Sequence, residues 1–218
     1  MNDFIKSIPK DVKLVAVSKT HSCEIIQQAY NSGLRIFGES KPQELAKKYS
    51  ELPKDTEWHF IGHLQTNKIK YIAPFVNLIH SVDSPRLLAE INKEAIKQNR
   101  IIKCLLQLHI AKEDTKFGFT IDELQKYLST NDFLKYTFVK IVGLMGIASL
   151  TDNTAQIRNE FQTMRKTFEM LKKTVFVNDS DFCELSMGMS SDYKIAISEG
   201  STIIRIGSLI FGERDYSK

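Results

Sequence analysis

A lysine near one end of the chain and an arginine near the other stand where side-chain chemistry is expected. Lys19 follows the apolar run 15–17 and Ser18, so it is predicted to lie at the mouth of a buried strand. Partial desolvation there lowers a lysine pKa and yields a neutral amine that can condense with an aldehyde or ketone. Arg205 has apolar neighbours, so it must be paired or bind an anion or acceptor. A solvated loop lysine and a structural ion pair are the alternatives.

Small residues after the last apolar run suggest a place for a phosphate group. Gly207 and Ser208 follow the run 202–206, where barrels often bind phosphate through backbone N–H groups. Ser186 and Ser190 flank a Met-Gly-Met segment. Structural roles also remain open, such as a turn at Gly207 or a helix cap at Ser190. An amine and a phosphate cradle at one end of a barrel are the two groups needed to bind pyridoxal 5′-phosphate (PLP).

The composition of the chain excludes several classes of protein. The 218 residues carry a formal net charge of +4, spread too evenly for a nucleic-acid-binding surface. Cys23, Cys104 and Cys183 form no CxxC pair, so neither a disulfide framework nor a zinc site is expected. The start of the chain lacks the apolar core of a signal peptide, and the apolar segment 141–150 is too short to span a membrane. We therefore expect a cytoplasmic protein with no metal, nucleic-acid or membrane partner.

Short apolar runs alternate with longer helical patterns along the chain. The runs are nearly continuous in apolar character, which is typical of parallel strands covered on both faces. They predict an α/β protein, a single-domain (β/α)8 TIM barrel over residues 1–218. A doubly wound open sheet is the alternative, but no glycine-rich loop follows the first run. The expected strands are 14–18, 35–38, 57–61, 76–80, 102–109, 138–144, 182–186 and 202–206.

Several helix ends are also recognisable. Gly33 follows a helical pattern, where glycine suits a left-handed terminus. Ser84 before Pro85 is typical of an N-cap. The segments 120–123 and 40–43 have capping-box residues at the right spacing. One long helix is expected to bury a stripe formed by Ile157, Phe161, Met164, Phe168 and Leu171.

In a barrel, the carboxyl ends of the strands meet at one face, where binding and catalytic residues collect. His63 and His109 lie there without carboxylate or cysteine neighbours at metal-ligand spacing. His59 is expected to be a core histidine, and Lys116 lies in a loop that could approach the site. The full set at the strand ends is Lys19, Glu39, Ser40, Gly62, His63, Ser81, Asp83, His109, Met145, Gly146, Ser186, Met187 and 205–208.

Segments along nearly the whole chain carry a further signal. They read VAVSKT at 15–20, FGE at 37–39, WHFIGHLQTNK at 58–68, HSVD at 80–83, GLM at 143–145 and LSMGMS at 185–190, followed by the stretch 200–214. In this order they resemble the pyridoxal phosphate homeostasis protein family, also called the YggS or proline-synthase-co-transcribed family. The number of matched segments makes the resemblance specific.

The resemblance implies a barrel similar to the amino-terminal domain of alanine racemase. It implies PLP held on Lys19 as an internal aldimine, Arg205 facing the pyridine nitrogen, and serines and glycine around the phosphate. The family usually has asparagine where this chain has Ser40, which leaves one ring-side contact open. The short segment before the first strand implies a trimmed or missing amino-terminal helix. The expected cofactor-binding residues are Lys19, Ser40, Met145, Ser186, Met187, Ser190, Arg205, Gly207 and Ser208.

Three functions compete for such a site. A racemase needs a base on each face of the cofactor, which alanine racemases take from a second domain, and a chain ending at Lys218 leaves no room for one. Arg205 on the pyridine nitrogen also makes the ring a poorer electron sink. A Schiff-base aldolase needs carboxylates beside Lys19, for which only Glu39 and Asp83 are candidates.

We therefore expect a non-enzymatic PLP-binding protein that serves vitamin B6 homeostasis as a carrier or buffer, with a racemase as the alternative. PLP-dependent apoenzymes are candidate recipients of the cofactor. The protein is expected to be a monomer or weak dimer.

Overall fold

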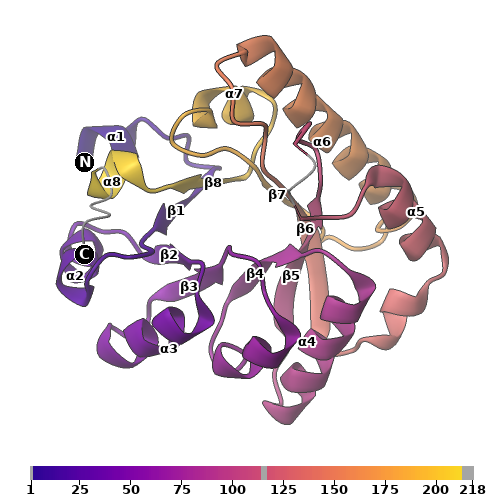
Figure 1. Ribbon diagram of the computed structural model, residues 1–218, viewed down its shortest axis with the longest axis horizontal. Coiled ribbons are helices and arrows are strands. Elements are labelled where there is room, and N and C mark those ends of the chain that lie inside the picture. The colour runs from indigo at the N-terminus through magenta and orange to yellow at the C-terminus, as the bar shows by residue number, and fades with distance from the viewer. Residues whose placement is uncertain (1, 114–116, 213–218) are drawn as a thin grey trace.

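The computed structural model describes residues 2–113 and 117–212. Its eight strands pair in chain order and close into a barrel, which appears as a ring in Figure 1. Every neighbouring pair is parallel, including the first strand with the last. The predicted (β/α)8 barrel is therefore confirmed and the open sheet is excluded. The strands are β1 (Lys13–Val17), β2 (Ile36–Glu39), β3 (Glu57–Phe60), β4 (Leu78–Val82), β5 (Ile102–Leu108), β6 (Val139–Gly146), β7 (Glu184–Ser186) and β8 (Ile203–Ile206).

Helices cover the outside of this ring (Figure 1). The connection from β3 to β4 carries a 3-10 helix in place of an α-helix. No helix in the described part of the chain is both long and apolar enough to cross a membrane. The helices are α1 (Asn2–Lys6), α2 (Cys23–Asn31), α3 (Pro42–Glu51), η1 (Thr66–Tyr71), α4 (Pro85–Lys97), α5 (Ile121–Ser129), η2 (Asp132–Lys135), α6 (Thr154–Thr174), α7 (Tyr193–Ser198) and α8 (Ser208–Phe211).

Two of the expected helix caps form in the structure and a third does not. Ser84 accepts a hydrogen bond from the Leu87 N–H at the start of α4, and Thr120 forms the predicted capping box of α5. The capping box at 40–43 was wrong, because α3 begins at Pro42 and its N-cap is Lys41. Pro42 fixes φ near its helical value and so starts the helix two residues after Ser40.

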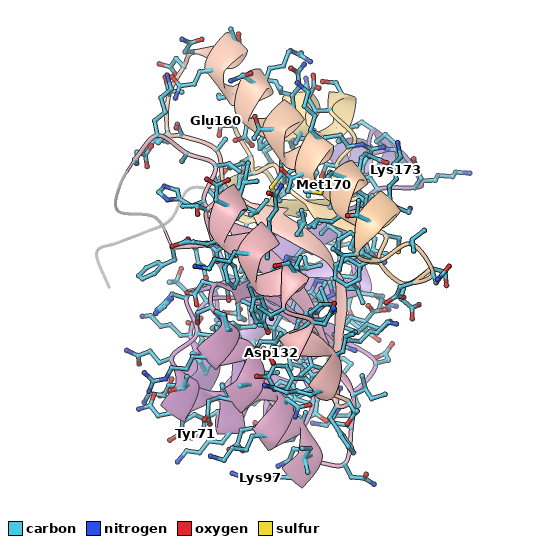
Figure 2. The ribbon with its side chains drawn as sticks, turned by 90° about the vertical axis from the view of Figure 1, so that its right-hand side faces the viewer. Tyr71, Lys97, Asp132, Glu160, Met170 and Lys173 are labelled. Atoms are coloured by element: carbon cyan, nitrogen blue, oxygen red, sulfur yellow. The ribbon has the colours of Figure 1, made fainter. Side chains whose placement is uncertain are left out.

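Apolar side chains fill two layers, one between the strands and the helices and one inside the barrel. The outer layer includes the fully buried Trp58 and Phe60. The predicted stripe of α6 is buried in it, while Figure 2 shows this helix crossing the outer wall with Glu160, Met170 and Lys173 along its length. The inner layer consists of Val15, Leu78, Leu105, Val142, Met145 and Ile203.

The amino-terminal helix is present but short. It consists of the single turn α1, which agrees with the expected trimmed helix. Its Phe4 packs edge-on against Tyr193 of α7, with ring centroids 5.6 Å apart. Both rings join a small cluster that covers Ile204 and Ile206 of β8. The start of the described chain is therefore packed against its last strand.

The alternation of side chains along β1 and β8 decides which residues enter the barrel. Val15 pairs with Arg205, and positions an even number of residues further along, such as Val17, share that inward face. Lys19 and Gly207 therefore lie at the carboxyl-terminal mouth.

On β6, Gly143 has a φ of +156°, and a Cβ there would lie 1.7 Å from the Glu184 carbonyl oxygen. Only glycine allows β6 to pack this closely against β7.

Candidate functional site

A pocket of about 820 Å³ opens at the carboxyl-terminal mouth of the barrel. Six of the predicted cofactor-binding residues line it, and they come from the strand ends of β1, β2 and β8 and the loop after β7. These six are Lys19, Ser40, Ser190, Arg205, Gly207 and Ser208. The remaining lining residues are Val17, His21, Ile61, Ile147, Met189, Ser191, Leu209 and Gly212. The pocket thus brings an amine, a guanidinium and several hydroxyl groups together.

The backbone on both sides of Lys19 is held in place. The Ser18 carbonyl accepts a hydrogen bond from Lys48 Nζ at 2.8 Å. The Thr20 N–H donates to Glu44 Oε1 at 2.7 Å, and Thr20 has a left-handed φ of 71°. A β-branched residue such as threonine is strained in the left-handed backbone conformation, so the surrounding contacts must hold Thr20 in it. Lys19 therefore projects from a short segment anchored at each end.

The anchor is a buried network of charges, which we call the Lys48 cluster (Ser18, Glu39, Glu44 and Lys48). Lys48 Nζ lies 2.7 Å from both Glu39 Oε1 and Glu44 Oε1, and Ser18 Oγ donates to Glu39 Oε1 at 2.6 Å. Burial raises the pKa of Glu39 against the pull of the Lys48 ammonium. Burial alone would raise the pKa of Glu44. Hydrogen bonds from Lys48 and the Thr20 N–H outweigh this effect and lower the pKa overall. The cluster joins the end of β1, β2 and α3 beneath the pocket.

Arg205 is almost fully buried but still reaches the pocket wall. Its Nη1 donates to Ser186 Oγ at 2.6 Å and its Nη2 donates to the Gly146 carbonyl at 2.9 Å. Both acceptors are neutral. Burial lowers the pKa of Arg205 to about 10, so the guanidinium remains charged at neutral pH. It offers a fixed cationic donor to a ligand in the pocket.

Serines and glycines form the opposite part of the wall. The Gly207 N–H points toward Ser190 Oγ at 3.4 Å. Ser190 is not a helix cap, because Asp192 holds that position at α7. Ser40 packs against Gly62, where a Cβ would lie 2.4 Å from the Ser40 carbonyl oxygen. Glycine at 62 thus permits the close approach of the loops after β2 and β3.

Three expected cofactor-binding residues are not on the pocket wall. Met145 belongs to the inner apolar layer, and Met187 packs in the outer layer, which faces the helices. Ser186 is fully buried, with its hydroxyl between Arg205 and a histidine ring. The expectation that Ser186 cradles a phosphate does not fit this placement. Because successive residues of β7 point to opposite sides, Ser186 faces inward beneath the pocket and Met187 faces outward.

Other polar residues at the strand ends have local partners. His63 Nδ1 lies 3.1 Å from Asp83 Oδ2, and its ring stacks on Phe117. His109 Nε2 lies 2.8 Å from the Glu113 carbonyl. Among the described residues, no group of three or more His, Cys, Asp or Glu side chains could hold a metal ion. Lys116 lies outside the described residues.

His21 is the pocket residue with acid–base chemistry that sequence reasoning missed. It lines the pocket and its ring lies 4.8 Å from that of Phe211. The signal available was its position two residues after Lys19 in the same loop.

Comparison with known proteins places this chain in a family. The chain matches the family described as alanine racemase, N-terminal domain, over residues 2–215. The pyridoxal phosphate homeostasis protein of Aquifex aeolicus is 42% identical over 205 residues, covering 94% of this chain and 88% of that protein. The chain belongs to the pyridoxal phosphate homeostasis protein family. The family member from Synechocystis is 35% identical over 215 residues, covering 98% of this chain and 96% of that protein.

Solved structures extend the comparison. PipY from Synechococcus elongatus, solved without PLP, matches this family member with a TM-score of 0.90 at 35% identity, and 97% of each chain is covered. PipY with PLP bound gives a TM-score of 0.87 at the same identity and coverage. The alanine racemase of Clostridium difficile gives 0.76 at 10% identity, covering 98% of this chain and 55% of that chain. At that identity the likeness shows a shared fold alone.

Proposed function

We propose that this chain binds PLP through a Schiff-base linkage to Lys19 and serves vitamin B6 homeostasis as a carrier or buffer without substrate turnover. The observation that carries the proposal is that Lys19 and Arg205 share one pocket wall with Ser190, Gly207 and Ser208. This set contains the amine, the ring-nitrogen donor and the phosphate-binding groups that PLP requires. The structure of the relative PipY with PLP bound supports PLP as the ligand.

Each group has a distinct role in this proposal. The Lys48 cluster orients the segment that carries Lys19. Arg205 would donate to the pyridine nitrogen, and because the guanidinium stays charged it would leave that nitrogen unprotonated and the ring a weaker electron sink. Ser190, Ser208 and the backbone of Gly207 bind the phosphate. The residues 1–218 are taken as one PLP-binding domain.

The make-up of the pocket wall favours a carrier over an enzyme. Among its described residues there is no carboxylate, thiol or phenol, and His21 is the one imidazole. The carboxylate of Glu39, a candidate for aldolase chemistry, is bound by Lys48 and Ser18 instead. Asp83 lies beside His63, away from the described wall. Racemase activity at this site would need His21 as the second base.

Borohydride reduction tests the linkage. The protein incubated with PLP should turn yellow, and reduction followed by peptide mapping should place the adduct on the Lys19 peptide. Lys19→Ala should abolish that adduct, whereas Lys41→Ala, which replaces an exposed lysine in the neighbouring loop, should leave it intact. An adduct on another lysine of the unmodified protein would overturn the assignment.

The carrier role needs its own measurement. We propose a cytoplasmic protein, a monomer or weak dimer, that passes PLP to PLP-dependent apoenzymes. Loaded protein should restore activity to an apoenzyme at a rate set by release from Lys19. Failure of loaded protein to activate an apoenzyme that free PLP does activate would favour storage over delivery.

A further inference from the structure

A line of polar side chains runs down the inside of the barrel from Arg205. Arg205 Nη1 donates to Ser186 Oγ at 2.6 Å, and Ser186 Oγ lies 2.9 Å from His80 Nδ1. His80 Nε2 then lies 3.0 Å from His59 Nδ1. We call Ser186, His80 and His59 the histidine column. It joins the wall of the PLP pocket to a cavity of about 560 Å³ at the opposite end of the barrel, which His59 lines.

The direction of the hydrogen bonds in this column follows from its chemistry. The guanidinium can only donate, so Ser186 Oγ accepts from it. The hydroxyl proton then needs an acceptor in a fully buried site, and His80 Nδ1 is the one within reach among the described groups. With Nδ1 accepting, a neutral His80 carries its proton on Nε2 and donates to His59 Nδ1. The whole column therefore donates away from Arg205.

The column is also uncharged. Burial lowers the pKa of His59 to about 3, aided by the positive charge of Lys13. Burial also lowers the pKa of His80 well below its usual range, and the neighbouring His59 and Arg205 add to the effect. Both rings are therefore neutral at neutral pH. Arg205 donates its hydrogen bonds to neutral acceptors, and the negative charge of Asp192 helps to keep the guanidinium protonated.

We propose that Ser186, His80 and His59 are positioning residues that fix the Arg205 guanidinium so that its remaining N–H groups face the ring nitrogen of PLP. The inference rests on the proposed function and extends it to residues that never touch the cofactor. Ser186 and the Gly146 carbonyl bind two different guanidinium nitrogens, which sets the plane of the group. His80, held by His59, fixes the direction of the Ser186 hydroxyl. The two histidines therefore act on the plane of the guanidinium through Ser186.

The test compares PLP with 1-deaza-PLP, in which a C–H group replaces the ring nitrogen. A charge-assisted hydrogen bond to that nitrogen should make the unmodified protein prefer PLP by roughly tenfold. Ser186→Ala and His80→Leu should reduce this preference to less than about threefold. His80→Gln should restore it, because an amide can accept from Ser186 and donate to His59. Affinity for 1-deaza-PLP should change little in every variant.

Ser81→Ala is the matched control. Ser81 is as deeply buried as its neighbour His80 and has a hydroxyl without a hydrogen-bond partner in the described structure. The preference of Ser81→Ala for PLP over 1-deaza-PLP should equal that of the unmodified protein. An unchanged preference in Ser186→Ala or His80→Leu would overturn the inference. Absence of PLP binding by the unmodified protein would instead overturn the proposed function.

A second measurement needs neither cofactor nor variants. Long-range proton–nitrogen correlation spectra of the unliganded protein report which ring nitrogen of each histidine carries the proton. His80 and His59 should both be neutral with the proton on Nε2. A proton on Nδ1 of either ring would reverse the column and contradict the inference even if the variants failed to fold.

Discussion

The ammonium group of Lys48 lies 2.8 Å from the backbone carbonyl oxygen of Ser18, the residue before Lys19. The same ammonium binds Glu39 of β2 and Glu44 of its own helix. One buried cation therefore ties together three elements and sets the backbone from which Lys19 projects.

Replacing Lys48 should damage both stability and loading. Lys48→Met leaves two carboxylates without their buried partner, so the free energy of unfolding should fall by about 3–5 kcal/mol. Borohydride-trapped PLP on Lys19 should fall as well. Chemical denaturation and peptide mapping measure the two effects. Lys47→Met is the control, because the exposed Lys47 lies 4.0 Å from Glu51 and should change stability by less than about 0.5 kcal/mol. Equal effects of both substitutions would refute a special role for Lys48.

The phosphate should dominate affinity. PLP should bind at least about a hundredfold more tightly than pyridoxal, because several charge-assisted hydrogen bonds are lost with the phosphate. Gly207→Ala should weaken PLP binding roughly tenfold without unfolding the protein, since the added Cβ would meet Val17 at an ordinary 3.4 Å but would intrude on the cradle. Titration and thermal melting separate these outcomes. Equal affinity for PLP and pyridoxal would argue against the cradle.

Stability should fall as the solution is acidified below neutral pH. An unfolded histidine takes up a proton near pH 6.5, whereas the folded His59 does not until about pH 3. Between these values the unfolded chain binds more protons, so the free energy of unfolding should drop by roughly 1 kcal/mol per pH unit for such a histidine. His80 adds to this slope in the same direction. Denaturation curves at several pH values should show a shallower slope for His59→Asn than for the unmodified protein.

Loaded protein should not racemise or transaminate amino acids. If Arg205 donates to the ring nitrogen as proposed, the ring is a poorer electron sink, and His21 is the one imidazole on the described wall that could act as a second base. Alanine should show negligible exchange of its α-proton in deuterated solvent. If a slow exchange is seen, His21→Ala and Lys19→Ala tell whether it comes from the pocket. Rapid exchange that disappears in Lys19→Ala would establish an enzyme.

The barrel and the order of its strands were predictable from the sequence because local patterns determine them, although β4 and β6 each end two residues later than expected. Continuous apolar runs mark parallel strands, and a lysine or arginine that ends or interrupts such a run has few places to lie. Lys19 and Arg205 were found in this way. The capping boxes were less certain, since 120–123 and 40–43 look alike, yet only the first forms.

Contacts between distant segments could not be predicted. β7 has only three residues, too few to show which of Ser186 and Met187 faces inward. Lys48 meets Ser18 across 30 positions of the sequence, and the histidine column links β3, β4, β7 and β8. Such contacts follow from how strands are staggered around the barrel, which no single segment encodes.

Pairing of β1 with β8 has a consequence for the protein during its synthesis. A ribosome releases Lys19 well before Arg205, Gly207 and Ser208, so a nascent chain carries the Lys19 amine before these other residues of the pocket wall are in place. PLP therefore stabilises only chains whose final strand has closed the ring. Products of premature termination gain nothing from the vitamin and remain open to proteolysis.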